Sequence, residues 1–83
     1  MEELDKKIAE WLGLDRVPHF SRSIGLCFKY IVPKIKDPEI AFYQFDDKSW
    51  EVSISYKSIY LKGTGEEPAL ALCRAAEKLI DGY

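Results

Sequence analysis

The sequence predicts an α+β domain with the element order α-α-β-β-β-α, in which a three-stranded antiparallel meander packs with helices as a sandwich. Two segments with helical spacing of apolar residues come first, three segments with strand periodicity follow, and a third helical segment comes last. The links between the strand segments are short, and short links join antiparallel strands but not parallel ones. We therefore expect one sheet in a single domain over residues 1–83.

Residues 2–12 are predicted to form the first helix. Its apolar residues recur at helical spacing and make one stripe, formed by Leu4, Ile8, Trp11 and Leu12. Acidic residues at the start of this segment suit the positive end of the helix dipole. Gly13 is expected to end the helix, because a glycine commonly follows the last helical residue.

The second helix is expected from about Ser21 to Val32. Ser21 is the predicted N-cap, because a serine hydroxyl there accepts a hydrogen bond from a backbone N–H of the first turn. Pro33 is expected to end the helix, since a residue before proline is disfavoured in the α conformation. The predicted buried face consists of Ile24, Cys27, Phe28 and Ile31.

Three strands are predicted at residues 39–45, 50–56 and 58–62. The first, "EIAFYQF", has apolar residues at both odd and even positions, which indicates that both of its faces are covered. The second alternates, so Trp50, Val52 and Ile54 are expected to face the helices. The aromatic residues expected on the opposite face are Tyr43, Phe45 and Tyr60. An aromatic face on a thin sheet either binds a ligand or pairs with a second copy.

The last helix is predicted at about residues 67–80, with Pro68 in its first turn, where a missing N–H costs nothing. Its expected core side consists of Leu72, Cys73, Ala76, Leu79 and Ile80.

Charge and composition exclude several classes of protein. The net charge is −2, and basic residues are interleaved with acidic ones, whereas nucleic-acid binders usually carry a basic surplus. No apolar run approaches the roughly 18 residues of a membrane span. The charged start reads as a helix and not as a signal peptide, so we expect a cytoplasmic protein. Two distant cysteines, Cys27 and Cys73, with one histidine predict reduced core thiols and no metal site or cofactor.

The segment "VPHFSRSI" holds the only histidine and permits two interpretations. It can simply start the second helix, with Ser21 as the cap. It can also bind a small anionic ligand, because free N–H groups at a helix start attract anions and His19 and Arg22 flank that point. Tyr43 or Tyr60 would then stack on a base, which suits a nucleotide. No G-x-S-x-G or P-loop pattern accompanies these residues, so we expect no enzyme and no catalytic residues.

Two resemblances to known families follow from longer stretches. The order of the strands and the run "GTGEEPALALCRAAEKLI" resemble a double-stranded RNA-binding domain. That family places lysines before the alanine-rich part of its last helix, and these lysines contact phosphates. Here Glu66, Glu67 and Pro68 stand in their place. This departure argues against nucleic acid as the partner.

The chain also resembles the phage ABA sandwich domain family of small phage and prophage proteins. The stretches "LDKKIAEWLG", "VPHFSRSI" and "GEEPALALCRAAEKLI" carry the resemblance and together span nearly the whole chain. Glu67 stands where the family often has a threonine, and Ser23 where it often has an aspartate. The resemblance implies a compact sandwich of helices and sheet in a phage accessory protein, without implying a reaction.

The functional expectation is a non-enzymatic phage or prophage accessory binding protein of the host bacterial cytoplasm. It would inhibit host defence by binding a host protein or by sequestering a small nucleotide-like signal. A homodimer is expected, formed through the aromatic sheet face or the first helix, because a small domain gains core by pairing. The alternative is a nucleic-acid binder of the double-stranded RNA type.

Overall fold

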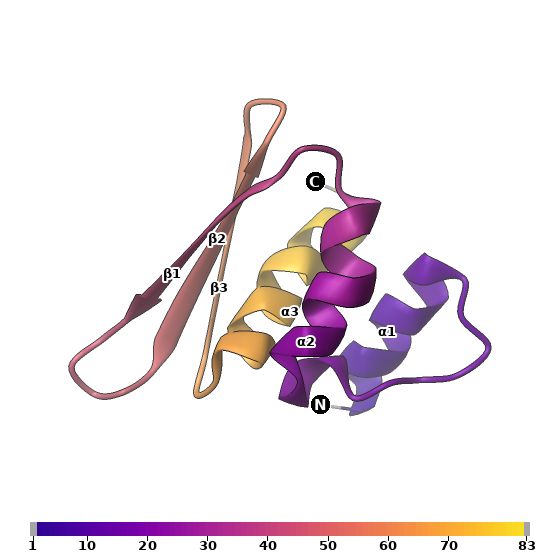
Figure 1. Cartoon of the computed structure of the whole chain (residues 1–83), viewed down its shortest axis with the longest axis horizontal. Coiled ribbons are helices and arrows are strands. Elements are labelled where there is room, and N and C mark those ends of the chain that lie inside the picture. The colour runs from indigo at the N-terminus through magenta and orange to yellow at the C-terminus, as the bar shows by residue number, and fades with distance from the viewer. Residues whose placement is uncertain (1, 83) are drawn as a thin grey trace.

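The computed structural model describes residues 2–82 and confirms the expected fold class, an α+β fold in which helices pack on a three-stranded antiparallel sheet. The helices lie together on one side of the sheet (Figure 1). The main helices are α1 (Glu2–Leu12) and α3 (Pro68–Ile80), close to their predicted limits. The strands are β1 (Glu39–Gln44), β2 (Trp50–Tyr56) and β3 (Ile59–Gly65), in the order β1-β2-β3.

The second helix differs from its prediction because it is built from four short segments. These are the 3₁₀ turn η1 (Phe20–Arg22), α2 (Ile24–Leu26), the π-helical η2 (Cys27–Ile31) and the 3₁₀ turn η3 (Val32–Lys34). The predicted N-cap was wrong. The hydroxyl of Ser23, and not of Ser21, accepts the capping hydrogen bond from the N–H of Leu26 at 3.2 Å.

The predicted end of this helix was also wrong. Val32 keeps helical backbone angles, with φ −60° and ψ −45°, and the chain makes a further turn through Pro33 to Lys34. A proline lacks an N–H and its ring crowds the carbonyl four residues earlier. The turn before Pro33 is the wider π form, in which the N–H of Val32 bonds to the carbonyl of Cys27. The wider turn lets the helix pass the proline.

The inner face of the sheet packs against α3 as predicted. Val52 pairs with Gly63, and Trp50 pairs with Gly65, so these residues share the helix-facing side. A Cβ atom on Gly63 would overlap the carbonyl oxygen of Ala71 and the backbone nitrogen of Ala75. The backbone of α3 therefore lies directly on β3. This strand is longer than predicted, because "GTG" belongs to it and not to a connector.

The prediction that both faces of β1 are covered was wrong. Tyr43 is 55% exposed, and Phe45 just beyond the strand is 46% exposed. The strand pairs with β2 alone, while α3 packs on β3 and β2. Figure 1 shows β1 at the edge of the sheet that is farther from α3. Its apolar sequence therefore does not mean that it is buried.

The core lies between the inner sheet face and the helices. Its largest fully buried side chains include Phe20, Ile8, Ile31, Ile54, Leu61 and Leu72. Phe28, predicted to be buried with Cys27 and Ile31, is instead 46% exposed. Its ring stacks on that of Phe42 in β1, with centroids 6.1 Å apart. Phe28 thus faces the sheet edge and not the core.

We predict that Gly63→Ala lowers the free energy of unfolding by about 3 kcal/mol or more, because the new methyl group would push α3 off the sheet. Urea denaturation followed by circular dichroism measures this change. Gly25→Ala is the matched control. The nearest atom to its Cβ is the Ser23 hydroxyl oxygen at 3.7 Å, so stability should stay constant or rise by up to about 1 kcal/mol. Equal effects of the two substitutions would contradict the packing described.

Candidate functional site

The first candidate, "VPHFSRSI", already binds an anion from within the chain. Ser21 is buried, and its N–H donates to Oδ1 of Asp5 at 2.8 Å. Its hydroxyl donates to Oδ2 of the same carboxylate at 3.1 Å. Asp5 is only 4% exposed. The carboxylate of Asp5 therefore occupies the donors that an external phosphate would need.

The other two residues of this candidate do not complete an anion clamp. His19 and Arg22 are both exposed. His19 lines a hollow of about 280 Å³ with Val17, Lys6 and the carboxylates of Glu2 and Asp5. Two carboxylates lower the affinity of such a hollow for an anion, because like charges repel.

The structure separates this segment from the two tyrosines. Tyr43 and Tyr60 lie on the outer face of the sheet, opposite to the row that packs on α3. "VPHFSRSI" belongs to the helical side. A ligand held by His19 and Arg22 therefore cannot stack on either tyrosine, and the five candidate residues do not form one site.

The outer face of the sheet is an aromatic surface of its own. Tyr43 is 55% exposed and Tyr60 51% exposed. Between them lies Ser53 of the central strand, which is 4% exposed and pairs with Ala41 on one side and Lys62 on the other. Lys62 Nζ lies 5.3 Å from the ring centroid of Tyr60. The face thus has small residues at its centre, flanked by tyrosines.

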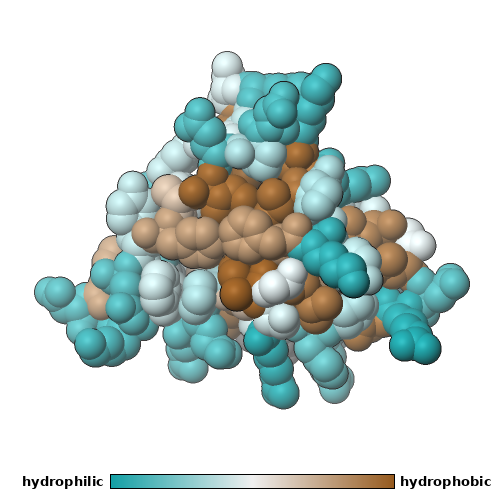
Figure 2. All heavy atoms as spheres, in the orientation of Figure 1, coloured by the Kyte–Doolittle hydropathy of each residue, from teal (hydrophilic) through white to brown (hydrophobic). Residues whose placement is uncertain are grey.

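A second apolar feature lies on the helical side, where the sheet meets the second helix. Figure 2 shows hydrophobic side chains gathered in the middle of this view, over the space between the sheet and the second helix. The stacked rings of Phe28 and Phe42 lie at this seam, and Phe28 is half exposed. We call this pair the phenylalanine seam.

The two cysteines are buried and free, as predicted. Their sulfur atoms lie 3.7 Å apart, and the Cys27 thiol also contacts the carbonyl oxygen of Phe20 at 3.3 Å. The hydrogen bond with Cys27, and then burial, raises the pKa of Cys73 far above its ordinary value. A thiol that stays protonated and out of solvent is a poor nucleophile. The pair therefore acts as packing.

The start of α3 borders a hollow of about 500 Å³. Exposed carboxylates of Glu66 and Glu67 line it, and Arg74 on the same wall donates to the carbonyl oxygen of Thr64 at 2.9 Å. The arginine is thus engaged by the backbone of β3. The two carboxylates disfavour the phosphates of a nucleic acid at this helix start.

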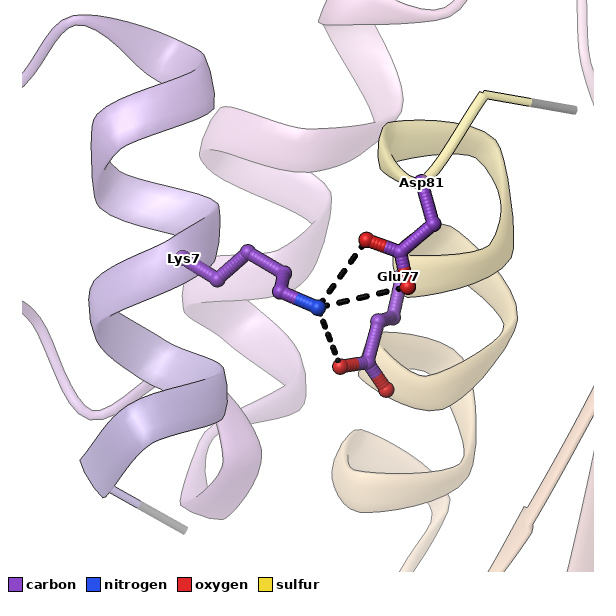
Figure 3. A network of polar contacts seen from close by, with 3 residues as sticks. All are labelled: Lys7, Glu77 and Asp81. Atoms are coloured by element: carbon purple, nitrogen blue, oxygen red, sulfur yellow. Dashed lines mark hydrogen bonds and ion pairs between the residues drawn. The ribbon is translucent and has the colours of Figure 1, made fainter.

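An ion cluster joins the two ends of the chain. Lys7 Nζ of α1 lies 2.8 Å from Glu77 Oε2 and 3.0 Å from Asp81 Oδ1 (Figure 3). The hydrogen bonds to Glu77 and then to Asp81 raise the pKa of Lys7 above its ordinary value. These side chains are 34–55% exposed, so the cluster orients α1 on α3 and adds little stability.

Two kinds of site are missing from the described chain. Within residues 2–82, no three histidine, cysteine, aspartate or glutamate side chains group closely enough to hold a metal ion. Over the same residues, every helix is too short or too polar to cross a membrane.

Sequence reasoning placed Asp5 only among the acids that suit the helix dipole, and missed that it is buried and bonds to Ser21. It lies three and four residues before Ile8 and Ala9, so it falls within the apolar face of α1, and this position was the available signal. An acid there needs a buried donor, and Ser21 supplies two.

The chain matches no family model, no curated protein and no solved structure. The resemblance to the phage ABA sandwich family therefore stays a prediction.

Asp5→Ala is expected to lower the free energy of unfolding by about 1–3 kcal/mol, because it leaves the buried N–H of Ser21 without an acceptor. Chemical denaturation measures the loss. Asp15→Ala removes an exposed carboxylate of the following loop and should change stability by less than about 0.5 kcal/mol. A wild-type stability for the Asp5 variant would show that the bond does not anchor the loop.

Both native thiols should react with a thiol reagent only as fast as the core opens, since neither sulfur reaches solvent. Time-resolved labelling with mass detection tests this. An Asp46→Cys variant supplies an exposed thiol in the β1–β2 turn as an internal standard. Labelling of Cys27 or Cys73 at the rate of the standard would overturn the packing role.

Proposed function

We propose that this chain is a non-enzymatic binding protein that holds a partner protein on the outer face of its sheet. The observation that carries the proposal is the pair of half-exposed tyrosines, Tyr43 and Tyr60, on a face that no helix of the described chain covers. Large exposed aromatic patches on small domains mark interaction sites.

The chemistry of this face favours a protein as the partner. Tyrosine is enriched in protein interfaces, because it buries a large ring and keeps a hydroxyl for hydrogen bonding. Glu51 and Lys62 add both signs of charge beside the tyrosines, which suits a polar rim. Tyr60 borders a hollow of about 370 Å³, but this hollow does not reach Tyr43. A small ligand in such a concave site would therefore use only one of the two tyrosines.

The titratable groups support a function without catalysis. A catalytic histidine needs a group that orients its ring. Within residues 2–82, no hydrogen bond joins the His19 side chain to a carboxylate or a hydroxyl. The two thiols offer no alternative nucleophile, because both are buried and the pKa of Cys73 is raised far above its ordinary value.

The phage resemblance supports an accessory role for this binding protein. In this proposal the partner is a protein of the bacterial host, and binding takes place in the host cytoplasm, where it inhibits a defence function. Sequestration of a nucleotide-like signal at His19 and Arg22 is less favoured, because Asp5 already bonds Ser21 between them.

Binding of double-stranded RNA is the alternative. The three-stranded sheet with helices on one side supports it, because that family has the same arrangement. The exposed Glu66 and Glu67 at the start of α3 oppose it. An affinity for duplex RNA that falls steeply with salt would favour this alternative over the protein partner.

Affinity capture from a bacterial lysate tests the protein partner. We expect one captured protein, identified by mass spectrometry, whose affinity for the Tyr60→Lys variant is at least about tenfold weaker, since aromatic anchors dominate interfaces. Val17→Lys is the matched control, because Val17 is 47% exposed on the helical side. The partner should bind this control as it binds the wild type. Equal capture by the two variants would contradict binding at the outer face.

A further inference from the structure

We propose that β1 pairs antiparallel with β1 of a second copy, so that two three-stranded sheets become one continuous sheet with both sets of helices on the same side. The inference extends the proposed function, because it joins the outer faces of two copies into one larger binding face.

The two edges of the sheet differ in how they are protected. Edge strands expose unpaired N–H and C=O groups, and proteins block them with charged side chains or cover them. On β3, Lys62 is part of the strand, and Arg74 donates to the carbonyl oxygen of Thr64 at 2.9 Å. On β1, no lysine, arginine or proline lies between Glu39 and Gln44. The open edge of the sheet is therefore β1.

The alternation of hydrogen bonds along β1 identifies the backbone N–H and C=O groups that lie on this open edge. The N–H of Phe45 donates to the carbonyl oxygen of Ser49 at 2.8 Å. Alternate residues of an antiparallel strand bond to the same neighbour, so Tyr43 and Ala41 also bond to β2. The residues that direct N–H and C=O away from β2 are Ile40, Phe42 and Gln44.

The hairpin between β2 and β3 independently gives the same alternation of hydrogen bonds. Lys57 and Ser58 have φ angles of 46° and 67° and form a two-residue turn, which makes Tyr56 and Ile59 a hydrogen-bonded pair. Even-numbered residues of β2 therefore bond to β3, and odd-numbered ones bond to β1. Glu51 is odd and pairs with Tyr43, in agreement with the alternation derived from Phe45.

These edge groups fit a two-fold axis through Phe42. Phe42 then lies opposite Phe42 of the second copy, and Ile40 lies opposite Gln44 of that copy. Every outward N–H and C=O of these residues finds a partner. Glu39, the only charged residue of β1, lies opposite an aromatic residue, Phe45, so no like charges meet within the strand.

The phenylalanine seam supports the same axis. Phe28 is 46% exposed and stacks on Phe42 with an angle of 29° between the rings. A two-fold axis at Phe42 brings the seams of two copies together on the helical side of the joined sheet. The half-exposed Phe28 ring of each copy would then be covered by the other copy, which accounts for an apolar surface that a monomer leaves in water.

Analytical ultracentrifugation over a concentration series tests the pairing. We expect twice the 9.6 kDa mass of the chain. Tyr43→Lys should raise the dissociation constant at least about tenfold, because Tyr43 lies opposite Ala41 of the second copy. Within its own chain the new lysine would face Glu51, so the fold should be retained. Tyr60→Lys, at the β3 edge, should leave the dimer unchanged. A monomer at every concentration, or equal weakening by both substitutions, would overturn the proposal.

Cysteine cross-linking tests the register. Ala41→Cys mixed with Tyr43→Cys should give a disulfide-linked dimer under mild oxidation, because these positions oppose each other about the axis at Phe42. Either variant alone should cross-link at least about tenfold more slowly, since its own cysteines then lie diagonally and farther apart. Faster cross-linking of a single variant would exclude this register.

The two proposals fail separately. If the chain is monomeric but Tyr60→Lys still abolishes capture of the partner protein, the outer face binds and the pairing through β1 is wrong. If the dimer forms through β1 but no captured protein depends on Tyr60, the pairing stands and the proposed function is wrong.

Discussion

The contact between α3 and the bare backbone of β3 is the constraint on which the rest of the structure depends. Gly63 has no side chain, and the carbonyl of Ala71 and the amide of Ala75 take up the space that a Cβ atom would fill. Gly65 receives Leu70 and Ala71 in the same way. The alanine-rich side of α3 matches this flat surface, because small side chains let backbones approach closely. Helix α3 is therefore fixed away from the centre of the sheet, above the edge strand β3 and its neighbour β2.

The position of α3 decides which surfaces of the sheet remain open. A three-stranded sheet is wider than the helix that covers β3 and β2, so β1 extends beyond the helical layer. Tyr43 is consequently half exposed on the outer face, whereas Phe42 on the inner face is partly buried and stacks on the half-exposed ring of Phe28. The proposed dimer edge follows from this off-centre helix, and the proposed binding face is open because the helices pack on the other face of the sheet.

Buried polar groups explain how the segment around His19 is held in place. The loop after α1 must return across the helix end, and its backbone needs hydrogen-bond partners once it is buried. Asp5 accepts a hydrogen bond from the backbone N–H of Ser21 and a second one from its hydroxyl, and Ser23 then caps the helix that follows. Ser23 serves as the cap, and Ser21, two residues earlier, is buried against Asp5.

The sequence by itself determined the fold class, the limits of α1 and α3, and the helix-facing row of β2, because hydrophobic periodicity is a local property of the chain. It also indicated that Tyr43, Phe45 and Tyr60 stay outside the core, and all three are exposed. Only the tertiary structure decided which serine caps the second helix, which strand forms the open edge, and that Asp5 is buried. These depend on contacts between residues far apart in the chain, such as Asp5 with Ser21 and Gly63 with α3, and no local pattern encodes which partner a side chain meets.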